Sequence, residues 1–336
     1  MRREYGLIGI SCVQHFLVDG LCICCMFLLT GLYSDQFGAY GDRVGLGAIL
    51  LYNVLAFMSQ PLTGLMADRM EKRHWLLVWS ALLLTLAVAV AWLLSMLVTS
   101  RLLMDDVSVE FLPMLVALLL GAGNSLFHVW GGKQTVVKAG NDLRALGVFV
   151  STGALGLAVG LVFRSWFLLY ALLLAIVLLA VTYVHWDNGS QVMTDSEKEW
   201  PQWLAPINVW MAVVLLMLFV SYRSFAGEVF SRGITKTHEL IIVIGATSML
   251  GKMAGGWIAR WMGILKSLMV ILAGVILCFL FRNGSELVLL LGVFLMNCTM
   301  PVTLYLANAV LPKREGLAFG LLAAALMPGY LLAVYL

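Results

Sequence analysis

His15 and Asp19 lie four residues apart inside the first long apolar segment of the chain. Residues at this spacing project from the same face of an α-helix. A carboxylate beside an imidazole in apolar surroundings can take up and release a proton near neutral pH. The pair is therefore a candidate for coupling to a proton gradient or for contacting substrate. The alternative is a structural hydrogen bond that holds this segment against a neighbour.

A lysine, Lys252, lies midway along a later apolar segment, beside Gly251 and Gly255. A lysine buried in lipid without a partner must lose its charge or find a counter-ion. Lys252 could bind an anionic substrate directly or pair with Asp19. Snorkelling of its side chain to the membrane interface is the alternative.

Other polar residues in apolar segments are weaker candidates. Arg223 and Glu228 are five residues apart in "YRSFAGEVFSR", so a helix places them on different faces. An outer-gate role and interfacial anchoring fit this pair equally well. His128 is expected to be a packing histidine. The neutral residues expected to line a substrate cavity, unless they only bridge helices, are Asn53, Asn124, Asn297 and Tyr305.

These side chains must be positioned by membrane-spanning helices. The chain of 336 residues is 62% hydrophobic and only 12% charged, about half the charge of a soluble domain. Apolar runs of about 20 residues recur, as membrane-spanning helices require. Continuous apolar runs exclude an outer-membrane barrel, whose strands alternate. Eleven spans are predicted, at 7–33, 44–67, 74–99, 111–131, 143–162, 165–185, 205–226, 239–260, 265–281, 286–310 and 315–336.

A polar, acidic connector follows the sixth predicted span and divides the chain into two halves. We expect an N-terminal six-helix bundle at 1–186, a connector at 187–203 and a C-terminal bundle with five spans at 204–336. All six cysteines fall in apolar runs, where they act as small hydrophobes. No metal site and no cofactor are predicted, and the net charge of +3 does not suggest a nucleic-acid partner.

The distribution of Lys and Arg predicts the orientation. With a cytoplasmic N-terminus, thirteen of the 21 basic residues fall in cytoplasmic segments and seven on the opposite side, with Lys252 inside a span. This bias places the charge cluster of "GLMADRMEKR", between the second and third spans, in the cytoplasm. We predict a multi-pass protein of a bacterial inner membrane.

Two halves, a cytoplasmic connector and the segment "GLMADRMEKR" together resemble the major facilitator superfamily. The segment is similar to that family's signature through Gly64, Asp68, Arg69, Lys72 and Arg73, although Glu71 replaces an expected glycine. The resemblance implies a two-bundle helical fold with twelve spans; eleven are predicted here, so we expect either that the last helix is absent or, as the alternative, that two boundaries are misread. It also implies that this cluster latches the cytoplasmic side closed, whereas a simple positive-inside anchor is the alternative.

A degenerate copy of the signature, "GKMAGGWIARWMGILK", lies between the eighth and ninth spans, with Arg260 where an Asp would be. Short pieces of the first, second and fourth spans also resemble the fosmidomycin-resistance group of efflux carriers: "HFLVDG", "YNVLAFMSQPLTG" and "GAGNSLFHVWGG". Val129 stands where that group has a proline.

The sequence thus predicts a secondary active transporter, not an enzyme, that moves a small molecule by alternating access. Coupling to protons is expected, efflux is the direction implied by the subgroup, and the protein is expected to be a monomer. No phosphate-binding loop for ATP and no His-Glu-x-x-His zinc motif occurs in the sequence. A receptor-like or degenerate carrier is the main alternative, and an intramembrane enzyme is a more remote one.

Overall fold

The computed structural model describes residues 2–70, 74–100, 106–140, 142–187 and 207–335, and these residues are helical apart from short connections. The helices of the N-terminal half are α1 (Arg2–Phe37), α2 (Ala39–Asn53), the π-helix η1 (Val54–Met58), α3 (Gln60–Arg69), α4 (Trp75–Thr99), α5 (Asp106–Ala139), α6 (Leu143–Val162) and α7 (Trp166–Asp187). Those of the C-terminal half are α8 (Val209–Arg232), α9 (His238–Met262), α10 (Ile264–Leu280), α11 (Glu286–Cys298), α12 (Met300–Val310), α13 (Glu315–Ala324) and α14 (Leu326–Tyr335).

Each of the eleven predicted spans lies largely on helix over the residues that the structure describes. Ten helical segments are long and apolar enough to cross a membrane, and α10, with 17 residues, is a shorter apolar helix. Large apolar side chains on their outer faces are exposed, for example Phe167, Trp261 and Leu287. Long helices whose outward-facing side chains are apolar are stable in contact with lipid and not in contact with water. The chain is therefore a multi-pass integral membrane protein.

Three spans are interrupted just before a proline. A proline has no N–H to give to the preceding turn and its ring clashes with that turn. The second span therefore breaks at Ser59 before Pro61, and the tenth breaks at Thr299 before Pro301. The eleventh breaks at Ala325, three residues before Pro328. The π-helical turn η1 in the second span was not predicted.

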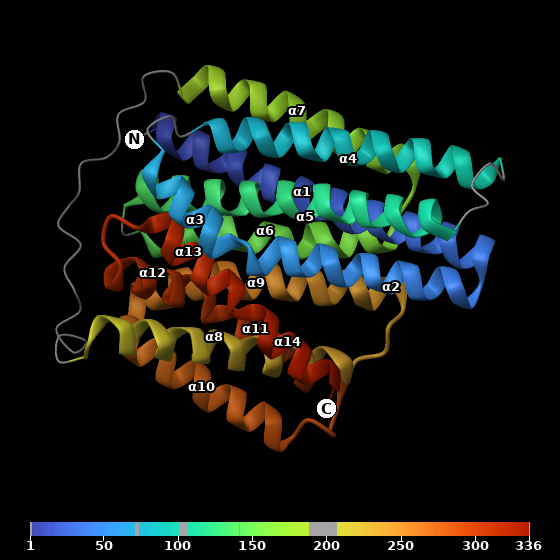
Figure 1. The fold of residues 1–336 in the computed structure, drawn as a ribbon. Helices are drawn as coiled ribbons and strands as arrows, with labels where there is room; N and C mark the ends of the chain where they lie inside the picture. The colour runs from blue at the N-terminus through green and yellow to red at the C-terminus, as the bar shows by residue number, and fades with distance from the viewer. Residues whose placement is uncertain (1, 71–73, 101–105, 141, 188–206, 336) are drawn as a thin grey trace.

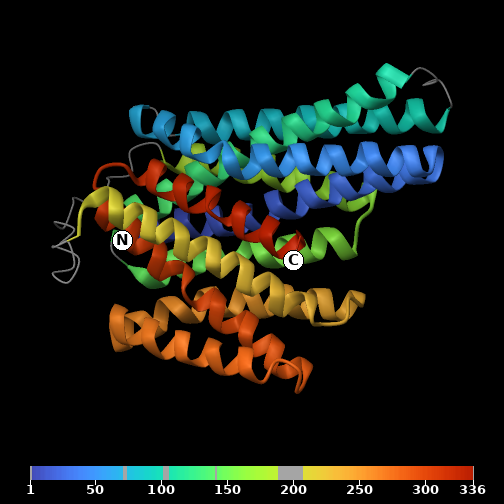
Figure 2. The ribbon, with the colours of Figure 1, turned by 60° about the horizontal axis from the view of Figure 1, so that its bottom comes forward.

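The two halves of the chain lie side by side along the long axis of the helices (Figures 1 and 2). One buried apolar cluster contains residues of α1 to α5 and of α7, and another contains residues of α8, α10 and α11, with partly buried residues of α9 packed against it. A third cluster contains residues from both halves, including Phe149 of α6 and Phe319 of α13. The limits of the two predicted domains fall in or beside 188–206, outside the described residues, and they stay a prediction.

Glycines allow helices of the two halves to approach closely at the end of the molecule where Asp68 lies, here called the Asp68 end. A Cβ atom on Gly64 of α3 would collide with the backbone at Gly316 of α13. At the same end of the molecule, but between a different pair of helices, a Cβ atom on Gly256 of α9 would collide with the backbone at Leu143 of α6. Small residues at helix contacts of this kind are typical of membrane proteins. Two junctions, α3–α13 and α6–α9, thus hold the halves together.

Candidate functional site

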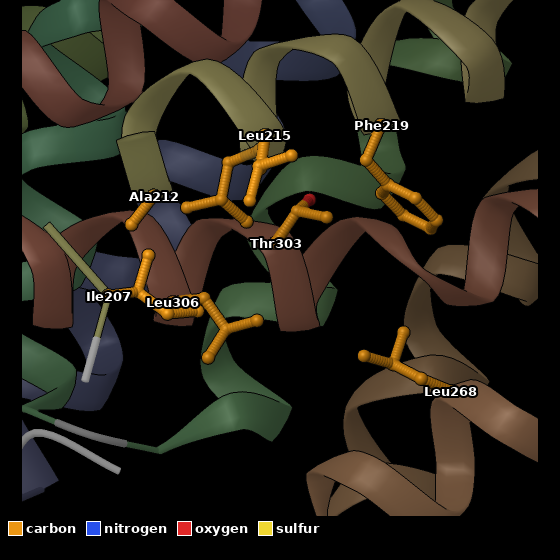
Figure 3. A pocket seen from close by; sticks show the side chains of 8 residues that line it. Ile207, Ala212, Leu215, Phe219, Leu268, Thr303 and Leu306 are labelled. Atoms are coloured by element: carbon orange, nitrogen blue, oxygen red, sulfur yellow. The ribbon is translucent and has the colours of Figure 1, made fainter. Parts of the chain in front are cut away.

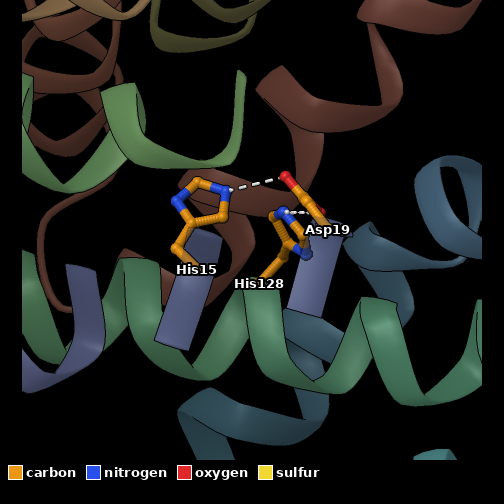
Figure 4. A group of neighbouring side chains, drawn as sticks. All are labelled: His15, Asp19 and His128. Atoms are coloured by element: carbon orange, nitrogen blue, oxygen red, sulfur yellow. Dashed lines mark ion pairs between the residues drawn. The ribbon is translucent and has the colours of Figure 1, made fainter. Parts of the chain in front are cut away.

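The candidate site is a cluster of polar side chains in the middle of the N-terminal half (Figure 4). Asp19 of α1 lies 3.3 Å from Nε2 of His15 through one carboxylate oxygen. Its other oxygen lies 3.3 Å from Nε2 of His128 on α5 and accepts a hydrogen bond of 3.2 Å from Asn124. His15 and Asp19 are only 5% and 7% exposed. The predicted pairing of these two residues is therefore present, and α5 completes it.

Backbone carbonyls hold both imidazole rings in place. Nδ1 of His15 donates to the carbonyl of Phe149 at 2.8 Å, and Nδ1 of His128 donates to the carbonyl of Asn124 at 3.0 Å. Gly153 of α6 covers the cluster, because a Cβ atom there would collide with the Asp19 carboxylate and the His15 ring. Both rings therefore direct Nε2 at the carboxylate.

Sequence reasoning interpreted His128 as a packing histidine and missed its contact with Asp19. Its ring lies edge-on to the ring of His15, with centroids 4.7 Å apart, and contacts Asp19. The contact was missed because His128 belongs to a different helix from Asp19, and spacing within one helix carries no information about contacts between helices. The sequence did contain a signal, since Asn124 and His128 are four residues apart and share a face.

Two basic residues of the C-terminal half lie at mid-length of their helices. Lys252 of α9 is close enough to both Asp19 and Arg223 for their charges to interact. Arg223 of α8 is 7% exposed, and its Nε atom has no hydrogen-bond partner among the described residues. No ion pair between Lys252 and Asp19 occurs in the described part of the chain. Neither cation therefore has a bonded counter-ion in the described part of the chain, and Arg223 is buried while Lys252 is half-buried.

The remaining predicted cavity residues are dispersed. Asn53 and Asn297 each donate to the carbonyl four residues earlier in their own helix, at 2.8 Å. Asn297 lies against Gly251, next to Lys252. Tyr305 is half-buried and packs against apolar clusters that involve both halves. Of the neutral candidates, only Asn124 bonds to the central cluster.

Asp68 of α3 joins the two halves of the molecule through direct hydrogen bonds. Its two carboxylate oxygens accept hydrogen bonds of 2.9 Å from the backbone N–H groups of Gly316 and Leu317, in the first turn of α13. Lys133 of α5, which sequence reasoning did not select, forms an ion pair of 2.9 Å with Asp68 and also donates to the carbonyl of Ala67. A carboxylate at a helix N-terminus is favoured by the helix dipole.

The other predicted gating residues have separate positions. Arg69 is exposed, and Arg73 lies outside the described residues. Glu228 pairs with Arg232, four residues later, and not with Arg223, because α8 is continuous through Gly227.

Arg260 on α9 is exposed and lies near Asp142, the N-cap of α6. Burial raises the pKa of Asp142, but hydrogen bonds from Arg144, aided by the charge of Arg260, outweigh this and hold the pKa below its ordinary value.

Two further features bear on what the site could bind. The ligand atoms of His15, Asp19 and His128 lie within 4.8 Å of one another, so this group could hold a metal ion, although no metal site was predicted. A separate cavity of about 220 Å³ between α8, α10 and α12 is lined by apolar side chains and Thr303 (Figure 3). The residues that line it include no titratable group.

Comparison of the fold with solved structures gives extensive similarity at low sequence identity. The E. coli fucose:proton symporter FucP matches with a TM-score of 0.68 and 12% identity, over 98% of this chain and 90% of that chain. The human organic anion transporter MFSD10 (TETRAN) matches with a TM-score of 0.68 and 16% identity, over 99% and 94%. The chain has a major-facilitator fold.

A third structure with this fold, a bacterial homologue of the iron transporter ferroportin in its outward-facing state, matches with a TM-score of 0.59 and 14% identity, over 98% of this chain and 90% of that chain. No protein-family model matches the sequence, and no curated protein matches it. The similarity therefore establishes the major-facilitator fold, while substrate, coupling and subgroup are matters of inference.

Proposed function

We propose that the protein is a secondary active transporter that moves a small molecule by alternating access, driven by protons bound at the central cluster. The observation that carries the proposal is that both His15 and His128 direct Nε2 at the buried carboxylate of Asp19. Ionisable residues at this depth in a membrane are costly and are retained where ions or substrates pass. We infer transport, not catalysis, because the fold is shared with solved transporters and because the Cys22 thiol, which accepts a weak hydrogen bond of 3.8 Å from Asn124 beside this cluster, is fully buried.

The hydrogen bonds of the two rings explain how the cluster would bind a proton. Because Nδ1 of each ring donates to a carbonyl, Nε2 of a neutral ring carries only a lone pair. That lone pair faces a carboxylate oxygen of Asp19, which is an unfavourable contact when Asp19 is ionised. A proton added at Nε2 turns the contact into a charge-assisted hydrogen bond. Proton binding would therefore strengthen the cluster and draw α1 and α5 together.

The Asp68 contacts supply the other requirement of alternating access, which is a closure that can open. Closing this end would need Asp68 at the N-terminus of α13, and opening it would need those two hydrogen bonds to break. The bias of Lys and Arg supports placing this end, together with the N-terminus, on the cytoplasmic side. A bacterial inner membrane, a monomeric state and efflux, which the fosmidomycin-resistance resemblance favours, belong to the same proposal.

Distances across the two ends of the molecule test this function without a known substrate. Spin labels on cysteines replacing exposed Trp75 and Trp261 report on the Asp68 end, and labels replacing exposed Phe163 and Phe281 report on the far end. The six native cysteines are buried, so labelling is directed to the new ones. Lowering the pH from about 8 to about 5, through the range where histidine titrates, should shorten one distance and lengthen the other.

The matched control is Asp19→Asn, which keeps the size of the side chain but removes the carboxylate. In this variant both distances should become independent of pH. Distances that stay constant in the unsubstituted cluster, or that change in the same direction at both ends, would contradict the proposal. Repeating the measurement with a chelator separates proton binding from binding of a metal ion, since only a metal effect is removed by chelation.

A further inference from the structure

Mid-membrane charges in this protein are unequal between the two halves. The C-terminal half contains no aspartate from 207 to 335, and its glutamates are Glu228, Glu239, Glu286 and Glu315. Three of these lie in the first turn of a helix, and Glu228 pairs with Arg232 in the last turn of α8. Arg223 and Lys252 therefore have no carboxylate of their own half at their depth in the membrane.

The carboxylate of the opposite half does not balance these two cations. Asp19 already accepts a hydrogen bond from Asn124 and contacts both histidines. Even when both imidazoles are neutral, a single carboxylate leaves the interior with an excess positive charge beside Arg223 and Lys252. An uncompensated charge buried in a membrane is expensive unless a ligand neutralises it.

The placement of Arg223 and Lys252 suits a ligand between the halves. Arg223 lies on the buried stripe of α8, one turn after Val220, which belongs to the apolar cluster shared by both halves. The backbone carbonyl of Lys252 lies against Gly147 of α6, in the N-terminal half. The charges of Arg223 and Lys252 repel each other, and no ion pair or hydrogen bond of either side chain occurs among the described residues.

We infer that the transported substrate is a small organic anion whose oxyanion group binds between the Arg223 guanidinium and the Lys252 ammonium. A guanidinium presents parallel N–H donors that match a carboxylate or a phosphate, and an ammonium adds a point charge. This inference rests on the proposed transport function and names its substrate class. Asp19 and the two histidines, on the opposite half, then remain free to carry the proton.

Thermal stability of the purified protein tests the inference without any transport measurement. Replacing either residue by methionine, Arg223→Met or Lys252→Met, removes an unpaired charge at mid-length of a membrane-spanning helix while keeping an apolar side chain of similar length. Each variant should therefore unfold at a higher temperature than the unsubstituted protein, by about 2 °C or more. The matched control is Arg232→Met on the same helix, which removes an ion pair with Glu228 and should lower the midpoint.

Binding of chemically matched probes gives the second measurement. Benzoate and phenyl phosphate should raise the unfolding temperature of the unsubstituted protein, because a ligand that binds only the folded state stabilises it. Benzyl alcohol and benzylamine, which have similar size but no negative charge, should not. The effect of the two anions should disappear in the doubly substituted protein, Arg223→Met with Lys252→Met.

Three outcomes would overturn the inference: lower unfolding temperatures for both single variants, equal stabilisation by benzylamine and benzoate, or no stabilisation by either anion. A lipid phosphate offers the same oxyanion, so the probes are also tested in nanodiscs of phosphatidylcholine and of phosphatidylglycerol. Stabilisation by phosphatidylglycerol with no effect of the soluble anions would overturn the assignment to a substrate. Because these measurements involve neither pH nor opening of the molecule, their failure is distinguishable from failure of the spin-label test.

Discussion

The two junctions that join the halves at the Asp68 end use the same backbone approach but different electrostatics. Gly64 meets α13 and Gly256 meets α6, each at the N-terminal turn of the partner helix. In the α3–α13 junction, a carboxylate from the neighbouring helix caps that turn. In the α6–α9 junction, α6 is capped by its own Asp142, and α9 contributes only the exposed Arg260 nearby.

This difference suggests that the two junctions have different roles. The Asp68 carboxylate is shared between the halves, so it loses contact with water when they close and regains it when they separate. The stability of the α3–α13 junction therefore depends on the charge of this carboxylate. The α6–α9 junction depends on close packing, and its cap is internal to one half. We therefore expect the α3–α13 junction to open and the α6–α9 junction to act as the pivot.

The largest expected effect comes from Asp68→Asn. This change removes the ion pair with Lys133 and weakens both hydrogen bonds to α13, and breaking a buried ion pair by removing one partner costs roughly 3 kcal/mol. The distance between labels at positions 75 and 261 should shift toward an open Asp68 end. The control is Asp35→Asn, at an exposed position on α1. A distance distribution that matches the unsubstituted protein would contradict a role for Asp68 in closure.

An intermediate effect is expected from alanine at either junction glycine. Gly64→Ala and Gly256→Ala each place a methyl group against backbone atoms of the partner helix, which cannot move aside as the end of a flexible side chain could. Overpacking of this kind costs about 1–3 kcal/mol, so both variants should unfold at lower temperature by similar amounts. Gly31→Ala is the control, since a Cβ atom there has no neighbour within 4 Å. If only one of the two junction variants were destabilised, the equivalence of the backbone contacts would be lost.

The smallest effect is expected from Arg260→Gln. Arg260 acts on Asp142 through charge alone at an exposed position, where solvent screens the interaction. The unfolding temperature and the label distances should both stay within error of the unsubstituted protein, at low and at high salt. A loss as large as that of Asp68→Asn would show that the second junction also depends on a charge between halves, and the contrast drawn above would fail.

Sequence reasoning located the spans because a membrane imposes a length and an apolarity on each helix. The three breaks in the spans have a similarly local cause, since proline acts on its own helix. Sequence reasoning did not find Lys133 as the partner of Asp68, or His128 as the partner of Asp19, because each pair joins different helices. Asn53 and Asn297 were expected to line a cavity, but each side chain instead donates a hydrogen bond to the backbone carbonyl one turn earlier in its own helix.

The π-helical turn Val54–Met58 has a consequence for how the second span tolerates change in length. A π turn accommodates one more residue than an α turn. The helical segments on either side of it therefore have the same rotational orientation relative to each other as in a regular α-helix one residue shorter. Deleting a single residue inside this turn would restore regular α geometry and leave Asp68 aligned with α13. The same deletion within α2 or α3 would turn everything beyond it by about 100°. This turn is therefore the place where the span can lose a residue without losing its contacts.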